Sequence, residues 1–519
     1  MNPITHTAHT AHTKAATNKI ILSTLNARYI HSSLGLRYIL ANMGELKKIT
    51  EINEFIINTR PIDIVERLLD KNPNIIGFGV YIWNVEQTTQ VIALIKQIKP
   101  EITIVIGGPE VSFEQEEQKI CQLADYVVCG AGDLEFPELC QQLFSKLKPI
   151  NNIIQARPRD LASLAFPYDE YTDEDVKNRV IYVEASRGCP FKCEFCLSAL
   201  DKTAVAFDLE KFLAELDKLY QRGVRHFKFV DRTFNLKIQS SIRILEFFLE
   251  RLDENLFLHF ELIPDHLPEK IKTIILKFPD GTLQFEIGIQ SFNPDVQDLI
   301  SRKQDNDKSE KNIRWLKNET HAHMHTDLIL GLPGETLKSI EEGFNQLVKL
   351  NPHEIQVGIL KRLRGTPLIR HTEKYQLRFN PDTPYNILSN VNIDFKTMQR
   401  LTRFARYWDM IANSGRFKHS KQLMLGERPF SNFLKLSDWL FKTTGQTHQI
   451  SLARLFELIF MVMTQHLDLL EGKVKACLWE DYLASSLKGN PSFADGGMIK
   501  ARNKKIDENR GANKRQNRH

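Results

Sequence analysis

The chain has 519 residues, of which 42% are hydrophobic, and a formal net charge of +5. This length predicts two to four domains with a large core, and the apolar fraction excludes wholesale disorder. Seven cysteines in so long a chain are not typical of a secreted protein held together by disulfides. No apolar run has the roughly 18 residues that a membrane span needs. We therefore expect a cytoplasmic protein without a signal peptide.

The first predicted domain, residues 18–146, has the pattern of a doubly wound parallel sheet. Residues 1–17 contain a repeat of His, Thr and Ala that cannot bury a core, so we expect a mobile tail there. Beyond that tail, short apolar runs alternate with helical patterns such as 60–69 and 85–98, which is typical of a parallel sheet covered by helices. The predicted strands are residues 20–25, 49–57, 75–80, 103–107 and 126–128.

Unusual loops follow several of these strands. A doubly wound sheet binds ligands beyond the carboxyl ends of its strands, at the point where strand order reverses. Tyr81 and Trp83 could cover one face of a flat ligand there, and glycine lets backbone approach such a ligand closely. The glycines at these strand ends that we expect to contact a ligand are Gly107, Gly108 and Gly130.

A second α/β series is predicted over residues 179–384, after a proline-containing linker over 147–178. Helical patterns such as 209–221 and 240–252 separate its strands. Six βα units indicate an open, six-stranded relative of the TIM barrel, whose chemistry lies at the carboxyl ends of the strands. The predicted strands are residues 180–184, 226–231, 257–262, 284–289, 325–330 and 354–360.

Three thiols follow the first strand of this series, at Cys189, Cys193 and Cys196, with the spacing C-x3-C-x2-C. Soft thiolates can hold iron–sulfur clusters, whereas a structural zinc site needs four ligands and no fourth cysteine or histidine lies nearby. A four-iron cluster on three thiolates keeps one iron open. A partial zinc knuckle or incidental cysteines are the alternatives.

Two further groups of possible ligands are interpreted as structural. Cys121, Cys129 and Cys140 are expected to be buried free cysteines that do not converge, because one lies in a helical pattern and another precedes a strand. The histidines of the run 321–325 could share a strand face, but no carboxylate partner is apparent, which favours an ordinary strand entrance.

The last part of the chain is predicted to be helical. Helical patterns cover residues 398–411, 431–441 and 452–470 within a domain over 385–490. Residues 491–519 form a basic tail, with eight Lys or Arg against two acidic residues between 500 and 519. The rest of the chain is close to neutral, so the protein as a whole lacks the charge balance of a polyanion-binding protein.

The cysteine motif, with Phe195 before its last cysteine, resembles the signature of the radical S-adenosylmethionine (SAM) enzymes. Segments at five later strand ends resemble those enzymes in order and spacing, among them Asp327-Leu-Ile-Leu-Gly-Leu-Pro-Gly-Glu335. The resemblance implies that the three cysteines hold a 4Fe-4S cluster whose open iron SAM chelates. It also implies that Phe195 packs near the SAM adenine and that Asp231 stands where the SAM amino group binds. Ribose or carboxylate would be held by Gln290, Ser291 and Arg302. Leu328 to Leu330 would offer backbone groups to the adenine, and Glu286 would belong to the same cofactor site.

The first domain resembles the cobalamin-binding domain that precedes the radical domain in one large class of SAM enzymes. The segments 107–109 and 125–130 carry most of this resemblance. The D-x-H-x-x-G loop of classical cobalamin proteins is missing, and His31 is the only histidine between Lys19 and Lys146. The resemblance therefore implies cobalamin without a histidine ligand, and the alternative is a degenerate domain that only docks on the barrel.

Together these resemblances imply an enzyme that cleaves SAM reductively and performs methyl transfer or radical ring closure on a small molecule. The layout is similar to that of the anaerobic magnesium-protoporphyrin monomethyl ester cyclases, and the helical domain to an uncharacterised extension of one branch. A one-electron donor such as flavodoxin or ferredoxin is implied as a partner. The alternatives are an RNA-modifying radical SAM enzyme, suggested by the basic tail, and an iron–sulfur electron carrier or sensor, which would have no use for the strand-end segments.

Overall fold

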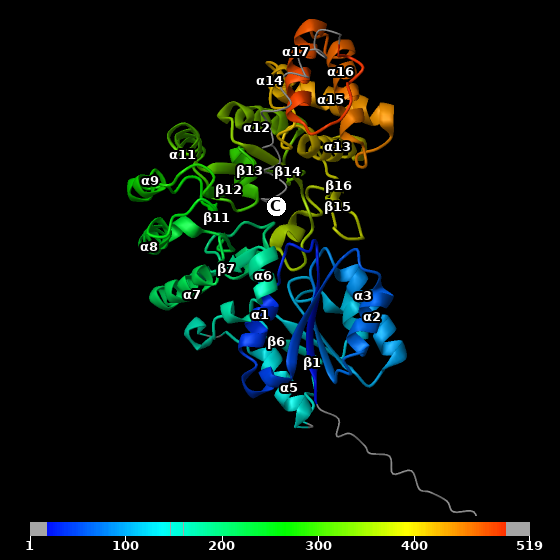
Figure 1. Ribbon diagram of the computed structural model, residues 1–519. Helices are drawn as coiled ribbons and strands as arrows, with labels where there is room; N and C mark the ends of the chain where they lie inside the picture. The colour runs from blue at the N-terminus through cyan, green and yellow to red at the C-terminus, as the bar shows by residue number, and fades with distance from the viewer. Residues whose placement is uncertain (1–17, 146, 159, 495–519) are drawn as a thin grey trace, which may run out of the picture. The chain divides into compact units, whose positions relative to one another are not determined.

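The computed structural model describes residues 18–145, 147–158 and 160–494 of the chain (Figure 1). The chain divides into two compact units, Met1–Val180 and Ile181–His519, which are described separately. The predicted mobile tail over 1–17 and all but the first four residues of the predicted basic tail lie outside the described residues.

The first unit is built on a six-stranded parallel sheet in the order β2-β1-β3-β4-β5-β6. Strand order reverses at β1, which pairs with β2 on one side and β3 on the other. Helices cover both faces, and each face has its own apolar core. The strands are β1 (Ile20–Asn26), β2 (Thr50–Ile56), β3 (Ile75–Gly79), β4 (Thr103–Gly107), β5 (Tyr126–Cys129) and β6 (Ile153–Gln155), and the helices are α1 (Leu34–Ala41), α2 (Pro61–Leu69), α3 (Val85–Ile98), α4 (Lys119–Leu123) and α5 (Glu135–Phe144).

The local sequence explains these elements. All seven residues of β1 are buried, as expected of a central strand covered on both faces. Helix α2 begins with Pro61 in its first turn, where proline's missing N–H costs no hydrogen bond. Its buried residues Ile64, Val65 and Leu68 have the spacing of one helical face.

The predicted linker over 147–178 contains secondary structure of its own, which the sequence interpretation missed. Strand β6 pairs in parallel with β5 and extends the sheet beyond residue 146. Helix α6 (Asp173–Asn178) follows, with a capping box between Thr172 and Asp175. Two short 3₁₀ turns lie between them, at Leu161–Ser163 and Tyr168–Glu170.

The three cysteines of the first unit lie apart, which confirms that they do not converge. Cys121 and Cys129 belong to the apolar core on one face of the sheet. Cys140 is fully buried in the core on the other face. The sheet itself therefore separates Cys140 from the other two thiols.

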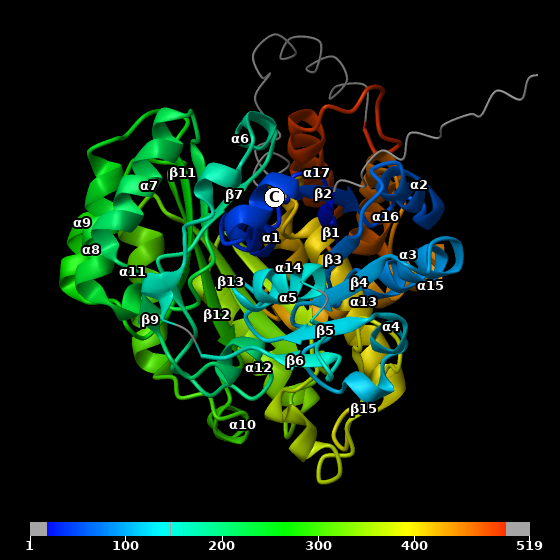
Figure 2. The same cartoon turned by 90° about the horizontal axis from the view of Figure 1, so that it is seen from below.

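The second unit contains a six-stranded parallel sheet in the order β14-β13-β12-β11-β10-β7. Helices lie between successive strands, and Figure 2 shows α7, α8 and α9 along the outer face of the sheet. This confirms the predicted partial barrel. The strands are β7 (Ile181–Val183), β10 (His226–Phe229), β11 (Phe257–Leu262), β12 (Leu283–Gln290), β13 (His323–Leu330) and β14 (Glu354–Ile359), and the helices are α7 (Leu209–Gln221), α8 (Ile238–Leu249), α9 (Glu269–Ile275), α10 (Pro294–Leu299), α11 (Asn306–Glu319) and α12 (Leu337–Leu350).

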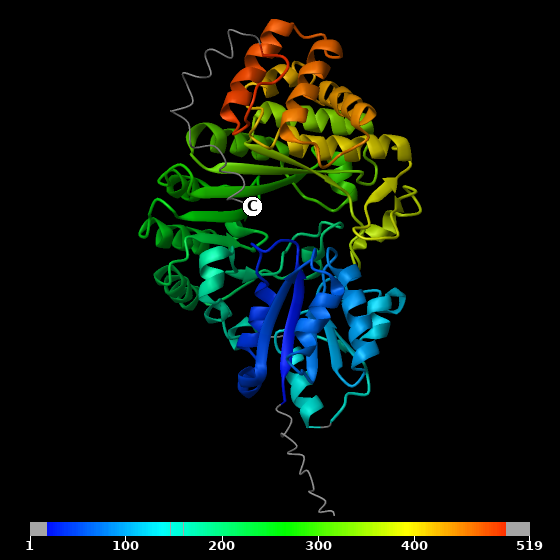
Figure 3. The same ribbon diagram turned by 45° about the vertical axis from the view of Figure 1, so that its right-hand side comes forward.

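A helical region follows β14 in the same unit (Figure 3). Its core is aromatic: the buried rings of Phe404, Trp408 and Phe433 pack together. A short antiparallel pair, β15 (Arg378–Phe379) and β16 (Ile387–Ser389), precedes the helices. None of the helices in the described ranges has the length and apolar character that crossing a membrane requires. The helices are α13 (Phe395–Ile411), α14 (Ser420–Leu425), α15 (Pro429–Thr444), α16 (Leu452–Gln465) and α17 (Glu471–Ala484).

Candidate functional site

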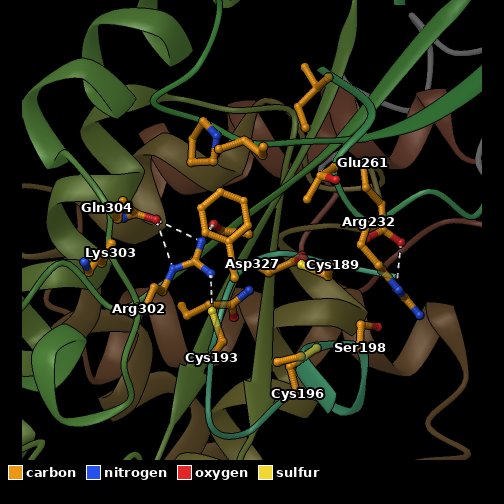
Figure 4. A pocket seen from close by; sticks show the side chains of 18 of the residues that line it. Cys189, Cys193, Cys196, Ser198, Arg232, Glu261, Arg302, Lys303, Gln304 and Asp327 are labelled. Atoms are coloured by element: carbon orange, nitrogen blue, oxygen red, sulfur yellow. Dashed lines mark hydrogen bonds and ion pairs between the residues drawn. The ribbon is translucent and has the colours of Figure 1, made fainter. Parts of the chain in front are cut away.

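A cavity opens at the carboxyl ends of the strands of the partial barrel (Figure 4). It measures about 980 Å³, including the part that is open to solvent. The predicted site residues that line it are Cys189, Cys193, Phe195, Cys196, Glu286, Gln290 and Arg302, and they are joined there by Arg232, Glu261, Gly288 and Asp327.

One loop carries all three thiols to this cavity. It leaves β8 (Ser186–Arg187), which pairs with β9 (Val205–Ala206), so the loop is closed at its base. Gly188 has a φ of 90°, and a Cβ there would lie 2.4 Å from the Thr203 carbonyl oxygen. The turn therefore requires glycine. Within the loop the Cys189 N–H donates to the Asp201 carbonyl at 3.0 Å, and the Cys196 N–H donates to the Cys193 carbonyl at 3.1 Å.

The three thiols are ligands of the kind that hold a four-iron cluster. Among the described residues, no group of three or more His, Cys, Asp or Glu side chains is arranged to hold one metal ion. The ligands of a four-iron cluster bind separate iron atoms, so they stand further apart than ligands of one ion. Three thiols from one loop at one cavity fit that donor set.

Burial and a nearby cation act in opposite directions on these thiols. Burial raises the pKa of Cys189 and of Cys193. The Arg302 guanidinium opposes this effect at Cys193, where its Nη1 lies 3.6 Å from Sγ. Arg302 also donates to the Gly288 carbonyl and, at 3.1 Å, to Gln304. A cation held in this position stabilises thiolate or any other anion in the cavity.

Two acceptors that line the cavity lack partners. Gln290 Oε1 and Asp327 Oδ1 are buried without a hydrogen-bond partner among the described residues. Gln290 also has a φ of 68°, which is unfavourable for a residue with a side chain. Gly288 leaves room for it, because a Cβ there would lie 2.4 Å from Gln290 Nε2. Buried acceptors without partners are costly, so these oxygens indicate a ligand with hydroxyl or amine donors.

The carboxyl groups around the cavity have pKa values shifted in different directions. Burial raises the pKa of Glu286, but the hydrogen bond from His259, with Nε2 and Oε2 3.0 Å apart, outweighs it and places that pKa below its usual value. Burial and the nearby charge of Glu286 raise the pKa of Asp327 well above its usual value. Burial also raises the pKa of Glu261, which accepts a hydrogen bond from Arg232 at 2.8 Å. The pKa values of Glu286 and Asp327 are therefore shifted in opposite directions.

Four other predicted site residues are not among those that line the cavity. Asp231 is buried and accepts hydrogen bonds from the Ala185 N–H at 3.0 Å and from Ser186 Oγ at 2.6 Å. Burial raises the pKa of Asp231 to about 7. Ser291 donates to Glu335 at 2.8 Å, while Leu328 and Leu330 are buried in β13. Their expected contacts with SAM stay predictions.

The sequence interpretation gave no role to Arg232, Glu261 or Asp327, which all line the cavity. Their positions on or just after predicted strands could have revealed them. Arg232 follows a predicted strand, Glu261 lies near the end of another, and Asp327 lies on a strand whose carboxyl end meets the same edge.

The histidine run 321–325 does have a carboxylate beside it, which corrects the sequence interpretation. Glu354 on the neighbouring strand lies 3.2 Å from His323 Nε2 and 3.1 Å from His325 Nε2. Although burial opposes a charge on His325, Glu354 raises the pKa of that imidazole. The local sequence could not reveal this partner, because it depends on the pairing of β13 with β14.

In the first unit, the loop after β3 carries Tyr81 and Trp83 to the end of β1, where strand order reverses. The rings of Tyr81 and Trp83 stack with centroids 4.5 Å apart, and Trp83 is 46% exposed. Trp83 Nε1 donates to the Leu25 carbonyl at 3.2 Å, which ties the loop after β3 to the end of β1.

The glycines at these strand ends permit close approach of the backbone. At Gly108, with a φ of 110°, a Cβ would lie 2.5 Å from the Val80 carbonyl oxygen, and Gly130 has a φ of 86°. At Gly107 a Cβ would lie 3.3 Å from the Val128 carbonyl oxygen. Gly108 therefore packs directly against the end of β3.

Comparison with known proteins agrees with this geometry. Residues 21–140 match the model of the B12 binding domain, and residues 183–347 match that of the radical SAM superfamily. The central barrel is a radical SAM domain. Residues 373–518 match a family described as a protein of unknown function (DUF4080). The predicted cofactors of such a chain are thereby confirmed: a 4Fe-4S cluster and SAM for the radical SAM domain, and cobalamin for the domain before it.

Relatives match more than half of the chain. The chain is 27% identical over 361 residues to an uncharacterized methyltransferase of Pyrococcus horikoshii, covering 64% of this chain and 77% of that protein. It is 23% identical over 354 residues to the cobalamin-dependent radical SAM methyltransferase TokK of Streptomyces tokunonensis, covering 60% of this chain but only about half, 51%, of TokK. The cobalamin-dependent SAM radical enzyme OxsB shares the fold, with a TM-score of 0.60 and 13% identity over 95% of this chain and 80% of OxsB.

Proposed function

We propose that this chain is a radical SAM enzyme that cleaves SAM reductively and transfers a methyl group to a small-molecule substrate with the help of cobalamin. The observation that carries this proposal is the cavity where Cys189, Cys193 and Cys196 meet the unpartnered acceptors Gln290 and Asp327. An iron–sulfur electron carrier would have no use for those acceptors. The similarity to two methyltransferases favours methyl transfer over ring closure.

Different residues of the cavity would bind different parts of the cofactors. Cys189, Cys193 and Cys196 would hold the cluster, while Arg302 would pair with the SAM carboxylate. Gln290 and Asp327 would hold the two ribose hydroxyls, and Phe195 would pack against the adenine. When bound, the cluster supplies one electron for the cleavage of SAM to methionine and a 5′-deoxyadenosyl radical, and cobalamin supplies methyl-transfer chemistry.

The first unit would hold cobalamin without a histidine ligand. Tyr81 and Trp83 present a stacked aromatic surface at the reversal of strand order, and Gly107, Gly108 and Gly130 let backbone approach a large flat ligand there. Changing His31 to Ala should leave the absorption spectrum of bound cobalamin almost unaltered. Loss of cobalamin in that variant alone would show that the ligand assignment is wrong.

Partners and location follow from the chemistry of the cluster. An enzyme of this kind needs a one-electron donor, and we place flavodoxin or ferredoxin in that role. Thiol-ligated clusters persist in reducing surroundings, which favours the cytoplasm. Nucleic acid is not expected as a partner, because outside its last residues the chain has no large excess of Lys and Arg over Asp and Glu.

Anaerobic reconstitution tests the proposal. The wild-type chain is loaded with iron and sulfide, reduced, mixed with SAM and assayed for 5′-deoxyadenosine. We expect product from the wild type and none from the variant in which Cys189, Cys193 and Cys196 are all Ala. A matched control changes Cys121, Cys129, Cys140 and Cys477 to Ser and should keep about four irons per chain. Product from the triple Ala variant would overturn the proposal.

A further inference from the structure

Glu194 lies inside the cysteine loop, between Cys193 and Phe195, but it does not line the cavity. It is only 3% exposed. One carboxylate oxygen accepts a hydrogen bond from Ser301 Oγ at 2.5 Å and pairs with the guanidinium of Arg370. The other oxygen lies 2.8 Å from His371 Nε2. Both oxygens of the carboxylate are therefore engaged by residues that do not line the cavity.

The backbone of Glu194 makes contacts with the same two segments. Its N–H donates to the Ile300 carbonyl at 3.0 Å, and its carbonyl accepts from the Leu368 N–H at 3.0 Å. One segment follows α10 and the other is the 3₁₀ turn Pro367–His371 after β14. A single residue thus joins the cysteine loop to two segments more than one hundred residues away in the chain.

These contacts reach the cavity through Ser301 and Arg302. Ser301 has a φ of 54°, in the left-handed region that a serine rarely adopts. The next residue is Arg302, whose Nη1 lies 3.6 Å from Cys193 Sγ. The hydrogen bond from Ser301 to Glu194 therefore fixes the backbone that directs Arg302 toward the residue before Glu194.

A buried carboxylate is retained at this position only if its partners compensate for its lost hydration. A loop cap would use neighbouring N–H groups, but all the partners of Glu194 are distant in sequence. We propose that Glu194 is a positioning residue, which sets the place of the three thiols and of Arg302 relative to one another. This inference rests on the proposed function of the cavity.

The test compares Glu194→Ala with Glu194→Gln in the full-length chain. Gln can still accept from Ser301 and Arg370, whereas Ala cannot. The matched control is Asp481→Ala, because Asp481 is also a buried carboxylate and accepts from His419 N–H, Ser420 N–H and Ser420 Oγ at 2.8, 2.9 and 2.6 Å, far along the chain in the helical region. The readouts are iron content, the electron paramagnetic resonance spectrum of the reduced cluster without SAM, and hydrogen exchange of residues 189–200 in the metal-free chain.

We expect Glu194→Ala to broaden the spectrum, to retain less than about half of the roughly four irons of the wild type, and to exchange at least about tenfold faster over residues 189–200. Glu194→Gln and Asp481→Ala should resemble the wild type in all three. The inference is overturned if Glu194→Ala resembles the wild type, if Glu194→Gln fails as badly as Glu194→Ala, or if Asp481→Ala shows the same losses. A wild-type chain that holds no four-iron cluster would instead contradict the proposed function.

Discussion

Burial and the charge of Glu286 raise the pKa of Asp327 well above its usual value, which favours the protonated carboxyl. Asn has the same shape and also offers a donor, so Asp327→Asn should bind SAM within about threefold of the wild type. Asp327→Leu removes both polar atoms and should weaken binding at least about tenfold. Equilibrium dialysis of reconstituted protein measures both, with the exposed acid Asp307→Leu as a control. Equal losses in the Asn and Leu variants would argue against a raised pKa of Asp327.

Glu335 provides a pH test at the same scale. Burial raises the pKa of its carboxyl from 4.5 to about 8. The folded chain therefore keeps a proton that the unfolded chain releases at lower pH. As pH rises between these two pKa values, the free energy of unfolding should fall by on the order of 1 kcal/mol per pH unit for this group. Above the higher pKa it should level off. Urea unfolding should show a smaller fall for Glu335→Gln than for the wild type. Identical pH dependence in the two proteins would show that the pKa of Glu335 is not raised.

At the residue scale, the sequence predicts the thiols but not the residues that hold them. The three cysteines share one loop, so their spacing is visible locally. The partners of Glu194 depend on the fold, because Ser301 and His371 come from segments after other strands. Asp231 shows the opposite case: it follows a strand as predicted, yet its carboxylate is taken up by Ala185 and Ser186.

At the scale of elements, strand β14 is an edge strand whose polar groups are capped by side chains. The Ile355 N–H donates to Asn413 Oδ1 at 3.1 Å, and the Ile355 carbonyl accepts from Asn413 Nδ2 at 2.8 Å and from Trp408 Nε1 at 2.9 Å. The amide of Asn413 thus occupies the place of a neighbouring strand, and helix α13 with the residues just after it covers an edge that would otherwise be open.

Replacing Asn413 with Leu should leave the buried Ile355 N–H without an acceptor and lower the free energy of unfolding by about 2–4 kcal/mol. Asn432→Leu is the control, because it removes one side-chain bond to the Leu425 carbonyl, at 2.9 Å, within the helical region. The control substitution should lower the free energy of unfolding by about 1 kcal/mol. Urea unfolding measures the difference, and hydrogen exchange at β14 should rise in the Asn413 variant alone. Equal stability of the two variants would mean that Asn413 does not cap the edge.

The elements themselves were largely predictable. Buried parallel strands are continuous apolar runs, so β1, β3, β4 and β11 lie within a residue or two of their predicted bounds. Strand β6 was missed because it has only three residues, none of them buried, between Pro149 and Pro158. The pairing of strands is not local information, which is why Glu354 was not recognised as the partner of His323 and His325.

At the scale of the whole molecule, the helical region belongs to the same compact unit as the radical SAM domain. Phe344 of α12 packs on Phe404, Trp408 and Phe430 of that region, so the two share an aromatic core. The region matched as DUF4080 therefore packs on the barrel through this shared core.

The central claim is that three thiols hold a cluster whose fourth iron is open to SAM. The most direct measurement is electron–nuclear double resonance of the reduced, reconstituted wild-type chain mixed with SAM that carries ¹⁵N in its amino group. We expect a ¹⁵N coupling that appears with labelled SAM and is absent with unlabelled SAM, because the amino nitrogen would bind the open iron. A chain that contains about four irons and binds SAM but shows no ¹⁵N coupling would contradict it.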